Sequence, residues 1–306
     1  MKRLAAALVG VTVGVFLLVH IVWAAPSAQT AQGAGAISAS LPPPDPAKLP
    51  ASHGLIVGAA ATSMAAFTAA VGVRPSILEH YAHPGDSFSA GFAGTAEPLI
   101  QIEPSKTPLA GFVAGTYDGW LRSYARAVVA YKKPVILGFG PEMNGTWSSW
   151  GYKHVQPAVY VAAWRHVVSV FRAAGARNVT WIWTVNVTHT GWDIASPDAW
   201  WPGAAWVDLV GVDGYYYASS QDFADLFALV LADIHRLTSK PVLISETAAA
   251  PVASKPAKIA DVFAGAHKAG LLGLVWFDLP GVKDWRLEDD PAAVAAFRGA
   301  AGQYSS

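Results

Sequence analysis

The sequence predicts a single (β/α)8 TIM barrel of the α/β class, and three observations lead to this prediction. Apolar runs with the length of a buried strand occur eight times after residue 54. Segments with helical periodicity lie between most of these runs, an alternation that favours a parallel sheet with crossover helices. The length of 306 residues also leaves room for one barrel of about 250 residues.

The first part of the chain is expected to lie outside the barrel. Lys2 and Arg3 precede an apolar run from Leu4 to Ala25, which is typical of a secretory signal peptide or of an uncleaved membrane anchor. Either alternative predicts export, as a secreted, periplasmic or membrane-anchored protein. A segment rich in Ala, Ser, Gln and Pro follows and predicts a disordered linker. The expected organisation is a signal or anchor over 1–25, a linker over 26–50 and the barrel domain over 51–306.

The predicted strands are short apolar runs, most of which end in a polar or aromatic residue. They are Leu55–Ala60, Ser76–Tyr81, Pro98–Glu103, Pro134–Phe139, Val179–Val185, Val207–Val212, Pro241–Ser245 and Leu272–Phe277. The predicted helices are Met64–Val71, Tyr117–Tyr131, Pro157–Ala174, Asp222–Thr238, Pro256–Ala269 and Pro291–Ala300. The segment Ser87–Gly94 is too rich in glycine to predict a helix. In such a barrel, the carboxyl ends of all strands meet at one mouth, where catalytic groups gather.

Two of these strands are followed closely by a glutamate at the strand tip. The fourth strand runs into a polar turn that contains Glu142, and the seventh runs into Glu246. Paired carboxylates at strand tips indicate glycoside hydrolysis, with one proton donor and one nucleophile. A structural alternative exists for each residue, because Glu142 could cap the next helix and Glu246 could interact with a helix dipole.

The other strand tips carry residues that we predict to bind substrate. Two of them, His80 and His189, fit hydrogen-bonding roles better than metal ligation, because no HExxH or His-x-His spacing occurs. We therefore expect no metal and no other cofactor. Glu103 could instead be a surface turn residue, and Asp213 a structural carboxylate at the rim. The full predicted set is His80, Glu103, Asn144, Trp147, Trp150, Asn186, His189, Trp192, Asp213, Tyr215 and Trp276.

The composition narrows the function further. The formal net charge of zero gives no electrostatic reason to expect nucleic-acid binding. The absence of cysteine excludes disulfides, thiolate nucleophiles and cysteine-ligated zinc. The count of 13 tryptophans is high, and those in loops suit stacking on the apolar faces of sugar rings. Trp147, Trp150, Trp192, Trp200 and Trp201 are such candidates, whereas Trp164, Trp181 and Trp183 fall at core positions.

Several motifs together resemble glycoside hydrolase family 26, the β-mannanase family. They are FGPEMNGTWSSWG from Phe139, YVAAWRHVV from Tyr160, GARNVTWIWTVN from Gly175, WWPGAAWVDLVGVDGYYY from Trp200, KPVLISETA from Lys240 and VWFDLPGVKDWRL from Val275. The resemblance implies a retaining (β/α)8 hydrolase of β-linked polysaccharides. It also implies that Glu142 is the acid/base, Glu246 the nucleophile and Tyr215 the pocket tyrosine beside it. Trp276 matches the tryptophan of the eighth strand, and Trp147 or Trp150 an aromatic residue of the sugar site.

One departure from the family leaves the substrate open. Mannanases of this family carry a histidine directly before the acid/base glutamate, where this chain has Pro141. The first expectation is an endo-β-1,4-mannanase, a monomer whose partner is the polysaccharide. Mixed-linkage β-glucan, xylan or a self-made exopolysaccharide are the alternative substrates. A membrane-tethered protein that binds polysaccharide without cleaving it is the alternative from another functional class.

Overall fold

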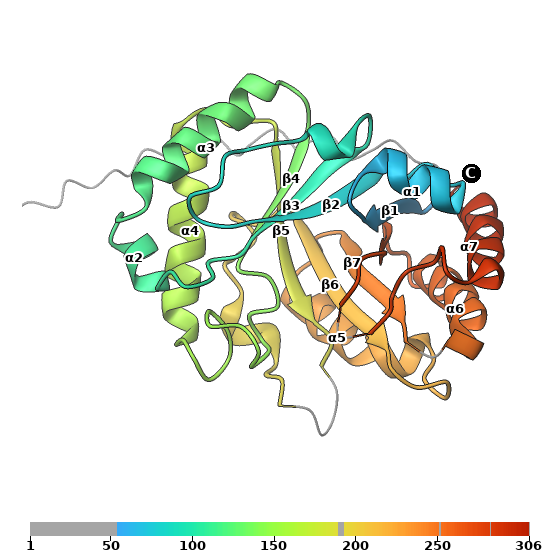
Figure 1. Cartoon of the computed structure of the whole chain (residues 1–306). Coiled ribbons are helices and arrows are strands. Elements are labelled where there is room, and N and C mark those ends of the chain that lie inside the picture. Colours follow the sequence, from blue (N-terminus) through green and yellow to red (C-terminus); the bar gives the residue numbers. More distant parts are fainter. Residues whose placement is uncertain (1–53, 189–192, 251, 282, 306) are drawn as a thin grey trace, which may run out of the picture. The chain divides into compact units, whose positions relative to one another are not determined.

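Eight parallel strands form a closed barrel in chain order in the computed structural model, which describes residues 54–188, 193–250, 252–281 and 283–305. Each strand pairs with its neighbours in the sequence, and the last pairs with the first (Figure 1). The strands are β1 Ile56–Ala60, β2 Ile77–Ala82, β3 Glu97–Ile102, β4 Val135–Phe139, β5 Val179–Asn186, β6 Leu209–Tyr216, β7 Val242–Ala249 and β8 Gly273–Phe277. The predicted barrel is therefore confirmed.

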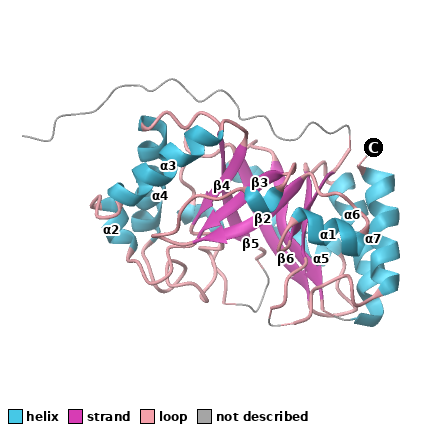
Figure 2. Ribbon diagram, turned by 45° about the horizontal axis from the view of Figure 1, so that its top comes forward, coloured by secondary structure: helices cyan, strands magenta, loops and turns pink. Residues whose placement is uncertain are grey.

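Helices cover the outside of the barrel (Figure 2). The α-helices are α1 Met64–Val71, α2 Leu109–Val113, α3 Asp118–Tyr131, α4 Pro157–Ala173, α5 Phe223–Leu237, α6 Lys255–Lys268 and α7 Pro291–Tyr304. The 3-10 turns are η1 Gly91–Ala93, η2 Pro197–Trp200 and η3 Val252–Ser254. Among the described residues, the connections after β2 and after β5 each contain a 3-10 turn and no α-helix, and the first of these agrees with the glycine-rich sequence of Ser87–Gly94. Local signals set several helix starts, including the Asp222–Asp225 capping box of α5.

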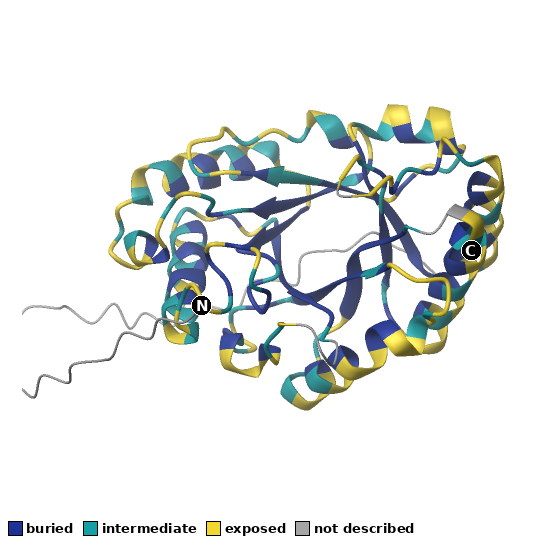
Figure 3. Ribbon diagram, turned by 60° about the horizontal axis from the view of Figure 1, so that its bottom comes forward, coloured by how far each residue is buried: buried dark blue, intermediate teal, exposed yellow. Residues whose placement is uncertain are grey.

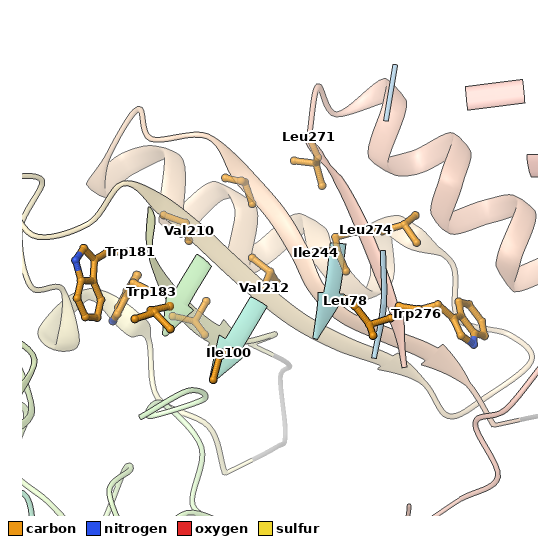
Figure 4. Close-up of a cluster of buried hydrophobic side chains, with 14 of the residues drawn as sticks. Leu78, Ile100, Trp181, Trp183, Val210, Val212, Ile244, Leu271, Leu274 and Trp276 are labelled. Atoms are coloured by element: carbon orange, nitrogen blue, oxygen red, sulfur yellow. The ribbon is translucent and has the colours of Figure 1, made fainter. Parts of the chain in front are cut away.

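The strands are buried on both faces, whereas the helices expose their outer faces (Figure 3). Alternate residues of each strand point into the barrel or out toward the helices. A small inner core contains Ile77, Leu99, Ile182, Leu243 and Val275, among others. A larger outer core joins the strands to the helices. Figure 4 shows part of it, including Trp181, Trp183 and Trp276.

A layer of buried polar side chains lies beyond the inner core, toward the carboxyl ends of the strands. This polar layer consists of Glu79, Gln101, Thr184, Asp213 and Ser245. Gly138 and Gly211 give it room, because a Cβ at Gly138 would lie 1.8 Å from Gln101 Oε1 and one at Gly211 would lie 2.5 Å from both Ser245 Oγ and Thr184 Oγ1. The Gln101 amide in turn donates to Thr184 Oγ1 at 2.8 Å. The end of the barrel interior nearest the mouth is therefore polar.

A β-bulge interrupts β7 at this level. Ile244 pairs with Val212, but the next pair joins Glu246 to Asp213, so β7 contains one extra residue. Ser245 and Glu246 consequently both point into the barrel, whereas strict alternation would turn one of them outward. The bulge therefore directs Glu246 into the mouth.

The proposed N-terminal segment and linker, residues 1–50, lie outside the described residues. Within the part of the chain that is described, no helix combines the length and the apolar character needed to cross a membrane.

Candidate active site

A cleft of about 870 Å³ opens at the carboxyl ends of the strands. Both predicted catalytic glutamates line it. Four further predicted residues do so too, namely Glu103, Trp147, Asn186 and Tyr215. Seven lining residues were not predicted as site residues: Tyr81, His83, Val187, Tyr217, Phe277, Gly281 and Trp285.

Glu142 occupies a strained turn after β4. Its φ is 54°, in the left-handed region that residues with a side chain rarely adopt. The turn is fixed by hydrogen bonds from Glu142 N to Thr184 O at 3.0 Å and from Gly145 N to Glu142 O at 2.9 Å. The carboxylate accepts a 2.6 Å hydrogen bond from the Trp147 indole N–H and another from the Asn186 amide. The turn thus holds the carboxylate toward the cleft, and one donor from the following loop and one from the end of β5 each bind one of its oxygens.

Two residues that we expected to contact sugar instead hold this turn from beneath. Asn144 is fully buried; it donates to Asn186 O at 2.8 Å and accepts from Asn186 N at 2.9 Å. Trp150 is 6% exposed, and its indole N–H donates to Pro141 O at 2.7 Å. Neither side chain lines the cleft, so these two predictions are corrected to structural roles. Trp200, which is also buried, is a third stacking candidate in the core.

Glu246 receives hydrogen bonds from two tyrosine hydroxyls. Tyr81 donates to Oε1 at 2.5 Å, and Tyr215 donates to Oε2. Burial, followed by the charge of Glu246, raises the pKa of both tyrosines well above the usual range, so they remain donors. Tyr81 was missed because the prediction chose its neighbour His80. The alternation of β2 could have found it, since Tyr81 shares the inward face with Ile77 and Glu79.

The environment of the cleft shifts the ionisation of both glutamates. Burial raises the pKa of Glu142, and the hydrogen bonds from Asn186 and Trp147 oppose this shift. Burial and then the charge of Glu142 raise the pKa of Glu246 to about 8, against the two tyrosine hydrogen bonds. Both shifts favour the neutral acid, so the pair retains a proton near neutral pH.

Two more carboxyl groups lie in the polar layer below the cleft. Burial raises the pKa of Glu79 and Asp213 well above the usual range, and the charge of Glu246 adds to both shifts. Asp213 Oδ1 accepts a 2.6 Å hydrogen bond from Ser245, and both residues are fully buried. Asp213 therefore does not reach the cleft, and its predicted contact with substrate is corrected.

The predicted contact of His80 with substrate is also corrected, because alternation along β2 turns this side chain away from the cleft. Its ring points outward from β2 and stacks on Phe92, with ring centroids 3.7 Å apart, and its Nε2 lies 2.9 Å from Ala61 O. It lines a separate cavity of about 380 Å³. Among the described residues, His83 lines the cleft, and its Nε2 lies 3.2 Å from Glu103 Oε2. Burial raises the pKa of Glu103, and His83 opposes that shift.

The predicted contact of Trp276 with substrate is corrected as well. The side chain is fully buried in the outer core (Figure 4). Its ring packs against Phe297, with ring centroids 6.0 Å apart. Its indole N–H donates to Trp285 O at 3.2 Å. The neighbour of opposite parity, Phe277, lines the cleft instead, together with Trp285 from the following loop. Trp285 lies in the motif VWFDLPGVKDWRL, but its loop has no periodicity that would have predicted its orientation.

The two remaining predicted residues, His189 and Trp192, lie outside the described residues. Among the residues that are described, no three His, Cys, Asp or Glu side chains gather in a way that could hold a metal ion.

Comparisons with known proteins point to one family. The sequence model described as Glycosyl hydrolase family 26 matches residues 122–249. Endoglucanase H of Acetivibrio thermocellus is 30% identical over 222 residues, which make up 68% of this chain and 24% of that protein. A mannan endo-1,4-beta-mannosidase of Bifidobacterium adolescentis is 26% identical over 161 residues, 50% of this chain and 15% of that protein. The chain thus spans a quarter or less of these two curated relatives.

The fold matches solved structures of the same family. A GH26 beta-mannanase from Bacteroides ovatus superposes with a TM-score of 0.64 at 15% identity, over 81% of this chain and 88% of that one. A GH26 endo-beta-1,4-mannanase from Bacillus sp. JAMB-750 also gives 0.64 at 13% identity, over 82% and 86% of the two chains.

Proposed function

Because the chain belongs to glycosyl hydrolase family 26, we propose that it is a retaining glycoside hydrolase that cleaves a β-linked polysaccharide, with β-1,4-mannan as the first substrate to test. The observation that supports this proposal best is the placement of Glu142 and Glu246 in one cleft, each with two hydrogen-bond donors. A carboxylate pair of this kind can protonate a leaving oxygen and attack the anomeric carbon.

The proton of the pair is assigned to Glu142. Tyrosine hydroxyls are far more acidic than amide or indole N–H groups, so Tyr81 and Tyr215 stabilise a carboxylate more strongly than Asn186 and Trp147 do. Glu246 is accordingly the ionised partner. Once Glu142 is neutral, its charge no longer raises the pKa of Glu246.

The reaction then runs in two steps. Glu246 attacks the anomeric carbon, while Glu142 transfers its proton to the glycosidic oxygen as the bond to the leaving sugar breaks. The ionised Glu142 next removes a proton from water, which attacks the glycosyl-enzyme ester and frees Glu246. This mechanism requires carboxyl groups about 5–5.5 Å apart.

A β-glucan is the second candidate substrate. Pro141 occupies the position where mannanases of the family carry a histidine. In addition, the relative at 30% identity is named an endoglucanase. The aromatic residues of the cleft would stack on either sugar, because both present apolar C–H faces.

Reducing-sugar release from β-mannan, galactomannan, lichenan and β-1,3-xylan tests the proposal. We expect one polymer to be cleaved by the purified chain and not by Glu246→Ala. Glu97→Gln, at the opposite end of β3, serves as the control that keeps full activity. With a dinitrophenyl β-glycoside and azide, Glu246→Ala should yield the α-glycosyl azide and Glu142→Ala the β-glycosyl azide. The same azide anomer from both variants would refute the double displacement. So would products of α configuration from the wild type, since they would show inversion.

Export is part of the proposal, because the polysaccharide substrates lie outside the cell. The apolar run from Leu4 to Ala25 is also typical of a signal peptide or membrane anchor. Fractionation of producing cells checks it, because the two alternatives predict release into the medium or retention with the membrane.

A further inference from the structure

One side of the cleft is built from aromatic rings that pack on each other. Tyr215 and Tyr217 lie 4.9 and 5.6 Å from Trp285, and Phe277 lies 5.9 Å from Tyr215, measured between ring centroids. We call these four residues the aromatic wall. All of them line the cleft. Tyr215 and Phe277 come from strands, but Tyr217 and Trp285 come from the loops after β6 and β8.

Three consecutive backbone carbonyl groups around Trp285 accept hydrogen bonds from side chains. Lys255 Nζ of α6 lies 3.3 Å from Asp284 O and 2.8 Å from Arg286 O, on either side of the tryptophan. The carbonyl of Trp285 itself accepts from the Trp276 indole N–H at 3.2 Å. A side chain from α6 and one from β8 thus fix the position of this ring.

Tyr217 is held by a second lysine of the same helix. Lys258 Nζ donates to the carbonyl oxygen of Gln221. The side-chain oxygen of Gln221 accepts from the backbone N–H groups of Tyr217 and Ala218, both at 2.8 Å. Lys258 thereby fixes Gln221, and Gln221 fixes the backbone that carries Tyr217.

The two lysines are three positions apart on α6, and both are buried. Lys255 is 2% exposed and Lys258 is 8% exposed, although lysine is almost never fully buried unless its charge is paired or hydrogen-bonded. Asp278 and Asp284 are acidic groups whose pKa the charge of Lys255 lowers. Burial raises the pKa of Asp278 to about 7, and Lys255 opposes that shift. Both ammonium groups are thus used mainly to bind loop carbonyls.

We infer that Lys255 and Lys258 are positioning residues for substrate affinity. They order the loops that carry Trp285 and Tyr217, and the ordered wall binds sugar units of the polysaccharide next to the cleaved bond. Neither lysine lines the cleft, so neither touches the reacting atoms. The role in affinity rests on the proposed function, but the role in ordering the loops does not.

The test compares Lys255→Met and Lys258→Met with Lys268→Met, a control at the exposed end of α6. Loss of a hydrogen bond from a charged donor weakens an interaction by about 1.5 kcal/mol or more, which corresponds to roughly tenfold in affinity. We expect KM for the polysaccharide to rise about tenfold in each buried-lysine variant, with kcat nearly unchanged. Lys255→Arg should recover part of the loss.

Hydrogen–deuterium exchange provides a second measurement that does not depend on activity. Amides of residues 283–287 should exchange faster in Lys255→Met, and those of 217–221 faster in Lys258→Met, with no change in Lys268→Met. If the wild type cleaves no polysaccharide, the exchange still tests the loops. Unchanged exchange, or a fall in kcat at constant KM, would overturn the inference. If a methionine variant does not fold, Lys255→Gln and Lys258→Gln, which keep a donor, replace it in the same comparison.

Discussion

Removing one hydroxyl from the nucleophile should move the acidic limb of the pH–rate profile. In Tyr81→Phe, Glu246 loses the 2.5 Å hydrogen bond to Oε1 but keeps the one from Tyr215. A hydrogen bond to a charged group contributes about 1.5–3 kcal/mol, and one pKa unit corresponds to about 1.4 kcal/mol. The hydroxyl lowers the pKa of Glu246, so its loss should raise that pKa by about one to two units.

The sign follows from the state that reacts. Glu246 must be ionised to attack, and a higher pKa delays ionisation to higher pH. The acidic limb of kcat/KM should therefore shift upward by about one to two pH units in Tyr81→Phe. Full pH profiles of the wild type, the variant and a Tyr131→Phe control, at the opposite end of the barrel, measure this shift. An acidic limb that stays in place or moves to lower pH would refute the assigned roles of Tyr81 and Glu246.

Two predictions concern stability. Gly138→Ala should lower the free energy of unfolding by about 1–3 kcal/mol in urea titrations, because the new Cβ would lie 1.8 Å from Gln101 Oε1. Glu97→Gln should stabilise the protein at high pH, since burial raises the pKa of Glu97 from 4.5 to about 7 in the folded state. The stability that its neutral form provides is complete below about pH 4.5 and is lost as the pH rises through 7, so the gain should approach at most about 3 kcal/mol at pH 8 and vanish at pH 4.

Each stability prediction has its own contradicting outcome. Gly119→Ala, in α3 with open space at its Cβ, is the control for backbone effects and should be neutral or slightly stabilising. Equal losses at both glycines would show that the polar layer does not constrain Gly138. A thermal shift from Glu97→Gln that is the same at pH 4 and pH 8 would rule out the ionisation of Glu97 as its cause.

The barrel could be predicted because each buried strand appears in the sequence as an apolar run, and each helix packed on the barrel shows apolar residues at helical spacing. The two glutamates were found because each follows such a run. The direction of a side chain at a strand tip was harder. His80 and Trp276 were chosen for their chemistry, although alternation along β2 and β8 places their neighbours Tyr81 and Phe277 on the inward face.

For other parts of the site, the neighbouring sequence does not indicate where the side chain points. The inward direction of Glu246 depends on a bulge, which is one extra residue relative to the strands on both sides and is invisible without the pairing. Trp285 reaches the cleft from a loop whose shape depends on Lys255, thirty residues earlier in the sequence. Asn144 was expected in the site because it follows Glu142, but its hydrogen bonds extend to another strand.

The extra residue in β7 has a consequence for protein redesign. A designer who regularised this strand by deleting Ser245 would leave the composition of the barrel almost unchanged and every neighbouring strand intact. The deletion would keep Glu246 opposite Asp213 and directed into the mouth, but the fully buried Asp213 would lose the hydroxyl that Ser245 donates to it. The extra residue thus allows β7 to supply one group to the polar layer and a second group to the cleft from two consecutive positions.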